Sequence, residues 1–581
     1  SGLRSRLRSL DLECPQDNLP VANTNALKPH RLAPHRRRLM FAASARESPL
    51  NHRVLSLQEP HHVKTVAQLL AAPFATVSAL ISAHAREQPQ QLALIDGVRT
   101  LTYAQLDALI DRAAAALQRD GVGNHGVVAL CAATSIEYVA LFIATLRVGA
   151  AACPLAPSAS AEQLAAMVRD CAAHVLFLDQ SVSAALDTVA EKLEVRHIAV
   201  PDAAHPSLES LDTWLAESGA QPAEVDVQPD QPFNIIYSSG TTGTPKGIVQ
   251  PHLMRWGHVR RAATLGYGPQ SITIVSTPLY SNTTLVSLIP TLVFGGTAVL
   301  MGKFEARAFL EQAQLHRATH AMLVPVQYRR LMDLPAFDTF DLSSFQMKTC
   351  TSAPFAADLK ADILRRWPGG LVEMYGMTEG GGSCLLRAHE FPHKLHTVGQ
   401  PAPGHDIRII NEAGIELTRG ESGEIVGRSG SMMKGYHNQP QKTAEAEWHN
   451  AQGERYLRTG DRGCFDEAGF LILGDRLKDL IISGGFNIYP SDLEAELAQH
   501  AAVAESAVVG IASREWGETP VAYVVLRPGQ TIDSEDLRLW VNARVGKTQR
   551  LSYLYIVPSL PRSAIGKVLK RQLREEHQPA G

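Results

Sequence analysis

Residues 237–247, TyrSerSerGlyThrThrGlyThrProLysGly, combine three kinds of group that bind an anion. The glycines let backbone N–H groups approach a negative charge closely, the serine and threonine hydroxyls donate hydrogen bonds, and Lys246 adds a positive charge. The spacing is not that of a Walker A loop, because Pro245 stands where the second glycine belongs and Gly247 where a serine or threonine belongs. A polar surface turn is the alternative interpretation, but eleven consecutive residues of this composition favour a phosphate-binding loop.

Four further blocks follow along the chain: TyrGlyMetThrGlu at 375–379, ThrGlyAsp at 459–461, a glycine-containing stretch at 474–490 and ProArgSerAlaIleGlyLys at 561–567. With the first segment, they resemble the motifs of the adenylate-forming superfamily and occur in the same order. That superfamily includes acyl-CoA synthetases, adenylation domains of peptide synthetases and luciferases. The resemblance extends from about residue 75 to about residue 575. Its five ordered motifs make it far more specific than any one of them.

The resemblance implies a reaction in two steps. A carboxylate is a poor acylating agent, so such an enzyme first joins it to AMP with release of pyrophosphate, and a thiol then attacks the activated carbonyl. Because an anionic oxygen must approach an anionic phosphate, placed cations and hydrogen-bond donors dominate the first step. The resemblance implies ATP, Mg²⁺ and coenzyme A as cofactor and co-substrates, and catalytic roles for Thr241, Glu379 and Lys567.

Four residues have a functional and a structural interpretation each. Lys567 resembles the mobile lysine that bridges the carboxylate and the α-phosphate, although a lysine near a C-terminus is by default a solvated charge. Glu379 is implied as the Mg²⁺ ligand rather than a solvated acid, since Mg²⁺ binds through one or two carboxylates plus phosphates. Asp461 and Arg476 are implied as ribose contacts, against a solvated turn acid and a weak surface ion pair.

Further contacts to the nucleotide or to coenzyme A follow from the same resemblance. Tyr375 offers a ring for adenine, or else is a core aromatic, and 352–354 resembles the segment on the other face of the base. Gly484 and Gly485 are expected to line the pantetheine tunnel, and Lys478 sits at the hinge of a swinging small domain. The full set is Ser238, Ser239, Gly240, Thr242, Gly243, Thr244, Lys246, Ser352, Ala353, Pro354, Tyr375, Gly376, Met377, Thr378, Asp461, Arg476, Gly484 and Gly485.

The pocket for the acid is expected around ProLeuTyrSerAsn at 278–282, which is similar to a ProLeuPheHis-type segment of the family but has serine at the histidine position. No aspartate occurs between 277 and 290, so a free α-amino acid is not the expected substrate. The apolar members of the expected lining favour an aliphatic or aromatic acid over a dicarboxylate. The lining residues are Tyr280, Ser281, Asn282, Val324, Met377, Gly381 and Ser383.

The elements that must position these residues are those of an α/β protein. Short apolar runs such as Val127–Cys131 and 175–178 are too apolar for a solvent-facing sheet and alternate with helical patterns near 103–120 and 136–147. Leu92–Asp96 and 100–102 flank AspGlyVal, a turn typical of a hairpin, and Thr102 and Gln105 have capping-box spacing. The uncharged stretch 271–301 is interrupted by prolines and glycines, which favours a buried strand–helix–strand unit over a membrane span.

The fold class expected is therefore a large N-terminal body of several subdomains with layered sheets and helices, followed by a small mobile α+β C-terminal domain. The predicted divisions are an N-terminal arm at 1–65, the adenylate-forming domain at 66–477 and a mobile lid at 478–581. The arm is rich in arginine and lacks periodicity, and we expect it to be flexible. Whether Met40 is the native start stays open.

The charge and cysteine content of the sequence limit the binding partners and the cellular compartment that we expect. The formal net charge of −3 gives no pull toward nucleic acid or acidic membranes, and seven scattered cysteines fit a reducing cytoplasm. We expect an acid–CoA ligase that uses ATP, CoA and a small-molecule carboxylic acid, fatty or aromatic and of unspecified chain length. We expect no transmembrane segment, and a homodimer is left open. One alternative transfers the acyl group to a carrier protein, although no carrier segment is evident after Lys567. Another is a degenerate family member that acts as a nucleotide-binding regulatory protein. The presence of all the expected catalytic and nucleotide-binding residues, Thr241, Glu379, Asp461, Arg476 and Lys567, counts against it.

We expect Lys567→Ala to slow adenylate formation by about 100- to 1,000-fold, the scale of removing a preorganised donor from a transition state. Thioester formation from a supplied acyl-adenylate should change far less, because Lys567 is expected to act only in the first step. Separate assays of the two half-reactions check this, and equal damage to both would contradict it.

Overall fold

We describe a computed structural model of the chain. It defines residues 64–576 except for 190–192, 201–207, 239–245, 477–478, 480, 484–485, 489, 514–515, 547–548 and 564–565. Val63–Gly581 clusters as one compact unit. Nearly all of the predicted arm at 1–65 lies outside the described residues, and the boundary at 477/478 stays a prediction.

The first large sheet is parallel at its centre and antiparallel at both ends. Its strands, in spatial order, are β16 (Gln400–Pro401), β15 (Gly380–Arg387), β14 (Gly370–Met377), β13 (Met347–Cys350), β12 (His320–Leu323), β10 (Ile272–Val275), β11 (Thr297–Leu300), β1 (Leu92–Asp96) and β2 (Arg99–Thr102). The central strands are apolar because helices cover both faces of a parallel sheet.

The second large sheet follows the same rule. In spatial order it contains β19 (Gly435–Tyr436), β9 (Lys246–Pro251), β8 (Pro232–Ser238), β4 (Ala151–Pro154), β3 (Val127–Cys131), β5 (Val175–Leu178), β6 (Arg196–Ala199) and β7 (Glu209–Ser210). Its core strands are parallel, whereas β9 runs antiparallel to both β8 and β19. The expected phosphate-binding loop is therefore the connection between the antiparallel strands β8 and β9.

Two smaller sheets complete the structure. The third sheet joins β17 (Asp406–Ile410), β18 (Gly423–Arg428), β21 (Arg455–Phe465), β20 (Glu447–His449) and β22 (Leu471–Arg476), all antiparallel. The other belongs to the C-terminal residues and joins β24 (Phe486–Ile488), β23 (Ile481–Ser483), β26 (Gly517–Leu526), β25 (Val503–Ser513) and β27 (Tyr553–Ile556).

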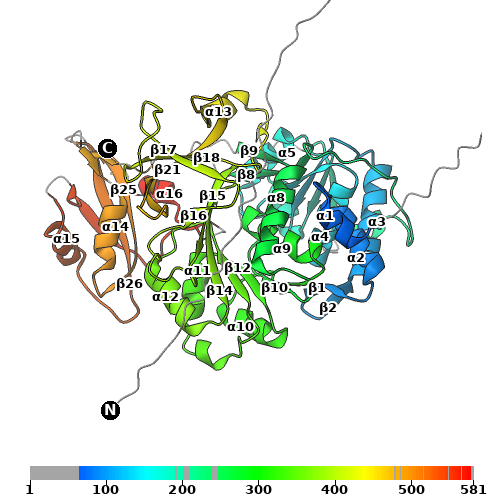
Figure 1. Cartoon of the computed structure of the whole chain (residues 1–581), viewed down its shortest axis with the longest axis horizontal. Coiled ribbons are helices and arrows are strands. Elements are labelled where there is room, and N and C mark those ends of the chain that lie inside the picture. Colours follow the sequence, from blue (N-terminus) through cyan, green and yellow to red (C-terminus); the bar gives the residue numbers. More distant parts are fainter. Residues whose placement is uncertain are drawn as a thin grey trace, which may run out of the picture. The chain divides into compact units, whose positions relative to one another are not determined.

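The helices cover these sheets (Figure 1). They are α1 (Val66–Ala71), α2 (Val77–Glu87), α3 (Tyr103–Arg119), α4 (Ile136–Arg147), α5 (Ala161–Asp170), α6 (Gln180–Leu186), α7 (Leu211–Trp214), α8 (His252–Ala262), α9 (Asn282–Val293), α10 (Ala306–Leu315), α11 (Pro325–Met332), α12 (Ala357–Arg366), α13 (Pro440–Glu445), α14 (Pro490–Ala498), α15 (Ser534–Asn542) and α16 (Lys570–Glu576). Within the described ranges, none of them has the length and apolar character needed to cross a lipid bilayer.

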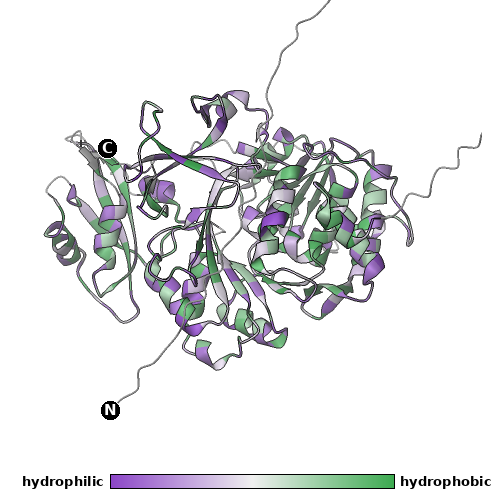
Figure 2. Ribbon diagram, in the orientation of Figure 1, coloured by the Kyte–Doolittle hydropathy of each residue, from purple (hydrophilic) through white to green (hydrophobic). Residues whose placement is uncertain are grey.

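The central helix layer holds the two large sheets together. Helix α4 contacts β3 and β4 of one sheet and β1 of the other, and α9 contacts β10, β11 and β12. One continuous apolar core runs through α2, α3, α4, α8 and α9. The outer faces are covered by α10, α11 and α12 on the first sheet and by α5 and α6 on the second. Figure 2 shows the corresponding pattern, with hydrophobic strands and mixed helix surfaces.

The local expectations from the sequence are confirmed. The hairpin β1–β2 and the strand–helix–strand unit β10–α9–β11 form as predicted, and Thr102 caps α3 in a capping box with Gln105. The expected C-terminal α+β pattern is also present, with α14 and α15 packed on one face of its sheet and α16 on the other.

A buried ion pair lies behind β14. Lys360 Nζ of α12 is 2.5 Å from Glu373 Oε2, and both side chains are almost completely buried. Lys360 also donates to the Thr397 carbonyl at 3.2 Å. Burial raises the pKa of Glu373 to about 7, while Lys360 acts in the opposite direction. The pair thus depends on both partners being present.

We expect Lys360→Met to lower the free energy of unfolding by about 3–5 kcal/mol, because it leaves the Glu373 carboxyl buried without its partner. The double variant Lys360→Met, Glu373→Leu should recover most of that loss, since no buried charge remains. Denaturant unfolding of both variants checks this. A double variant no more stable than the single one would contradict it.

Candidate active site

The expected site residues follow the carboxyl ends of neighbouring strands. Tyr280 follows β10, Val324 follows β12, Ser352 follows β13 and Thr378 follows β14, and these four strands are adjacent in the order β14–β13–β12–β10. Ligands of α/β sheets bind outside the carboxyl ends of the parallel strands. The fold therefore brings the segments expected to contact adenine, phosphate and the acid to one edge of the first sheet.

The expected phosphate-binding loop begins at the end of β8. Residues 239–245 and the side chain of Ser238 lie outside the described residues, so the contacts of Ser239, Gly240, Thr241, Thr242, Gly243 and Thr244 stay predictions. Lys246 is described at the start of β9. Its Nζ lies 4.9 Å from the ring centroid of Tyr436 on β19. An aromatic face of this kind attracts a cation and restricts where the lysine reaches.

Glu379 is tied to the same tyrosine. The Tyr436 hydroxyl donates to Glu379 Oε1 at 2.9 Å, and Met433 N–H donates to the Glu379 carbonyl at 2.8 Å. Burial, followed by the Glu379 charge, raises the pKa of Tyr436, so the hydroxyl remains a donor. One ring thus links Lys246, expected at the phosphates, to the carboxylate expected at Mg²⁺.

Tyr375 and Asp461 form a second polar contact. The Tyr375 hydroxyl donates to Asp461 Oδ2 at 2.9 Å. Burial raises the pKa of Tyr375 above its usual range, and the Asp461 charge adds to this. Its ring packs partly buried beside the core of the third sheet. Asp461 is also the register partner of Arg476 across β21 and β22, although the side chain of Arg476 lies outside the described residues.

The segment expected at the adenine base is held in an unusual conformation. Ser352 has φ +82°, in the left-handed region that a non-glycine residue rarely adopts. Its hydroxyl is 2.7 Å from Thr283 Oγ1 on α9, and the Thr351 hydroxyl donates to the Met374 carbonyl at 2.7 Å. These contacts fix the residues that precede Ala353 and Pro354.

The acid-pocket residues occupy distinct positions around this edge. Ser281 is the N-cap of α9 and its side chain accepts a hydrogen bond from Thr283 N–H, which gives a structural reason for serine at this position. Asn282 Oδ1 is buried without a hydrogen-bond partner in the described structure. Ser383 N–H donates to His405 Nδ1 at 2.9 Å. Gly381 (φ +76°) lies so close to the Gly427 carbonyl that an added side-chain carbon would be 3.0 Å from its oxygen.

The segment that carries Lys567 reaches Val324. A side-chain carbon added at Gly566 (φ +78°) would lie 2.6 Å from Val326 Cγ1 and 3.5 Å from Val324 Cγ2. Lys567 is exposed, and its N–H donates to Ser563 Oγ at 3.2 Å in the turn that Gly566 makes. The expected catalytic lysine is therefore next in sequence to a residue that touches the expected acid pocket. Lys478, Gly484 and Gly485 lie outside the described residues.

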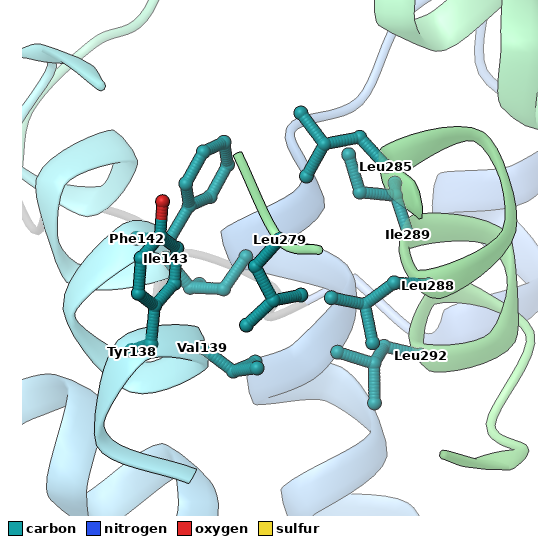
Figure 3. A pocket seen from close by; sticks show the side chains of 9 residues that line it. All are labelled: Tyr138, Val139, Phe142, Ile143, Leu279, Leu285, Leu288, Ile289 and Leu292. Atoms are coloured by element: carbon teal, nitrogen blue, oxygen red, sulfur yellow. The ribbon is translucent and has the colours of Figure 1, made fainter. Parts of the chain in front are cut away.

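A small apolar cavity of about 10 Å³ lies between α4 and α9 (Figure 3). Its lining is Tyr138, Val139, Phe142, Ile143, Leu279, Leu285, Leu288, Ile289 and Leu292. This volume is about that of one water molecule. The contact between α4 and α9 is therefore packed protein interior, and this cavity is too small to bind an acyl chain. Leu279 nevertheless anchors the residue next to Tyr280 in this core.

Sequence analysis did not single out Tyr436 and Gln250, which contact expected site residues, or Arg255, which contacts Gln250. Gln250 donates to the Thr378 carbonyl at 2.5 Å, and Arg255 donates to Gln250. The available signal was the presence of polar residues within apolar strands, since Asn234 and Gln250 lie in the two strands that flank the loop and are completely buried. Tyr436 carries no comparable signal.

Comparison with known proteins decides the family. A model described as "AMP-binding enzyme" matches residues 81–437, and one described as "AMP-binding enzyme C-terminal domain" matches residues 492–567. The chain belongs to the AMP-binding enzyme family. Its two family domains occur in the order that the sequence motifs predict.

The chain aligns with nearly the whole length of two curated members of this family. Indoleacetate–CoA ligase of Aromatoleum aromaticum is 32% identical over 86% of this chain and 98% of its own. Feruloyl-CoA synthase of an Amycolatopsis species is 32% identical over 84% of this chain and 96% of its own.

Solved structures of the AMP-binding enzyme family agree with the fold. The amide bond synthetase McbA from Marinactinospora thermotolerans has a TM-score of 0.75 at 29% identity, covering 86% of this chain and 99% of its own. ATP-bound MatB from Rhodopseudomonas palustris has a TM-score of 0.75 at 28% identity, with the same coverage. The expected α/β body and small C-terminal domain are thereby confirmed.

We expect Tyr375→Phe to raise KM for ATP by about tenfold or more, because hydrogen bonds to charged groups contribute about 1.5–3 kcal/mol and Asp461 loses this orienting donor. The matched control is Tyr456→Phe, which removes an equivalent tyrosine donor 2.5 Å from Asp406 Oδ2 in the third sheet. ATP saturation curves of pyrophosphate release test both. An equal rise in the two variants would contradict a local role of Tyr375.

Proposed function

We propose that this protein is an ATP-dependent, AMP-forming acid–CoA ligase that acts on an aromatic carboxylic acid. The observation that carries the proposal is the near-complete span of curated relatives named for this activity, with both family domains in order. The proposal includes release of pyrophosphate in the first step and formation of a thioester in the second. Action in the cytoplasm is part of it, supported by the scattered cysteines of the sequence.

The site geometry supports a role for each group. Thr378 and Glu379 are consecutive residues that we propose to face the phosphates. The Tyr436 ring lies against Lys246 and its hydroxyl donates to Glu379, so Lys246 is held near this segment. A carboxylate beside phosphate-binding groups is the type of ligand that Mg²⁺ takes, and the ion would reduce the negative charge that opposes attack of the acid. Asp461, oriented by Tyr375, suits the ribose hydroxyls. Lys567 is proposed to reach the reacting carboxylate, because the adjacent Gly566 contacts the Val324 and Val326 side of the pocket.

The aromatic class is supported by the relatives and by the pocket. The relatives are named for indoleacetate, for a feruloyl product and for 4-coumarate, all of which carry an aromatic ring. In this chain, Tyr280 and Met377 keep part of their surface accessible and Val324 is buried. Such groups suit a flat apolar ring.

Coenzyme A is the proposed acceptor, and two other acceptors are outcomes of the test. One relative is named as a fatty acid–acyl-carrier-protein ligase, and one structural neighbour is an amide bond synthetase. All three activities share adenylation and differ only in the nucleophile that attacks the activated carbonyl. The acceptor is therefore decided in the second half-reaction.

The test measures pyrophosphate release from the full chain with indole-3-acetate, hydroxycinnamates, benzoates and short, medium and long fatty acids, each with CoA, with a phosphopantetheinyl carrier protein, with an amine and with no acceptor. We expect the highest kcat/KM for an aromatic acid and a thioester product only with CoA. Preference for a fatty acid, or product with only the carrier protein or amine, would overturn the corresponding part. Absence of acid-dependent turnover with every acid would overturn the whole proposal.

A further inference from the structure

A buried polar cluster lies beneath the β8–β9 hairpin. It contains Asn234 on β8, Gln250 on β9 and Arg255 on α8, each at most 1% exposed. Asn234 and Gln250 are register partners, and α8 begins directly after β9. The cluster therefore sits on the two strands whose connection is the expected phosphate-binding loop.

Arg255 is a buried cation held by amide oxygens. Its Nε and Nη2 donate to Asn234 Oδ1 at 3.0 and 2.8 Å, and Nη2 also donates to Gln250 Oε1. The guanidinium lies over the Phe233 ring, 5.6 Å from its centroid. No carboxylate of the described residues forms a salt bridge with it, and burial lowers its pKa to about 9. Burying a cation without a paired anion costs free energy of folding. A buried arginine at this position is therefore expected to have a specific structural role.

That role lies in the orientation of one amide. A guanidinium has only donors, so the Gln250 side chain must turn its oxygen toward Arg255. Asn234 Nδ2 donates to the same oxygen at 3.0 Å. The Gln250 amide nitrogen consequently points the other way, and it donates to the Thr378 carbonyl at 2.5 Å. Donors and acceptors thus alternate from Arg255 through Gln250 to the loop after β14.

We propose that Arg255 and Gln250 are positioning residues that hold the Thr378–Glu379 segment at a set place relative to the β8–β9 hairpin. This inference rests on the proposed function, in which that segment faces phosphate and Mg²⁺. Tyr436 joins the same two parts through Glu379 and Lys246, so the Gln250 contact is a second, buried point of attachment. Two separate attachments restrict rotation of the segment as well as its distance from the hairpin.

The sharpest variant is Gln250→Glu. It keeps the size of the side chain and keeps an acceptor for Arg255, but it replaces the donor that faces the Thr378 carbonyl with an acceptor. We expect the dissociation constant for a non-hydrolysable Mg·ATP analogue to rise about tenfold or more, since a lost hydrogen bond and an opposed pair of acceptors are worth at least about 1.4 kcal/mol. The thermal midpoint should change little, because the carboxylate gains Arg255 as a partner.

Two further variants separate positioning from stability. Gln118→Glu is the matched control, because Gln118 Nε2 likewise donates to a backbone carbonyl, that of Ala223 at 2.9 Å, but on α3. It should leave Mg·ATP binding unchanged. Should Gln250→Glu not fold, the double variant Gln250→Met, Arg255→Met removes the amide and its buried cation together and should show the same loss of Mg·ATP binding.

Mg·ATP binding is measured by calorimetry on the full chain, beside the Mg²⁺ dependence of pyrophosphate release and KM for the acid. A weaker Mg·ATP affinity and a higher Mg²⁺ requirement, with KM for the acid nearly unchanged, support positioning. An unchanged Mg·ATP affinity in a folded Gln250→Glu or double variant overturns it. Wild-type protein that binds no Mg·ATP would instead overturn the proposed function, so the two failures are distinguishable.

Discussion

The site depends on the antiparallel pairing of β9 with β8 on one side and with β19 on the other. This pairing places Lys246 and Tyr436 on neighbouring strands, and the Tyr436 hydroxyl reaches across to Glu379 of the first sheet. A hairpin from one sheet and a loop from the other are thereby joined by side chains. In the proposed function the phosphates bind between these two parts, and electrostatic stabilisation requires the groups on both sides to be in place beforehand.

The large sheets supply the rigid frame for that joint. The helix layer of α4, α8 and α9 is apolar on several sides and packs against both sheets, so neither sheet can shift without disturbing the common core. Site residues emerge where the parallel strands end, and their backbone positions follow from the strand order. The polar contacts described for Tyr375, Asp461 and Ser352 add orientation to positions that the frame already determines.

Much of this organisation could be predicted from residue patterns. Apolar runs such as Val127–Cys131, the capping box at Thr102 and the turn signals around 97 identify their elements because these signals are local. The motif at 375–379 and the segment at 352–354, both picked out by resemblance, lie at the ends of β14 and β13. What sequence reasoning could not supply were contacts between segments far apart in the chain. Tyr436 approaches Glu379 across 57 residues and Gln250 approaches Thr378 across 128, and neither spacing has a pattern in the sequence.

In the proposed function an adenine base stacks against the segment that contains Ser352, and the left-handed conformation of this residue would then have a thermodynamic consequence for binding. A non-glycine residue in this region costs about 1–3 kcal/mol, and here the cost is met by the Thr283 hydroxyl and the surrounding fold rather than by an arriving ligand. The wall is consequently shaped in advance. Binding then loses less entropy than it would on a wall that had to become ordered first, and selectivity among purines becomes a matter of fit to a fixed surface.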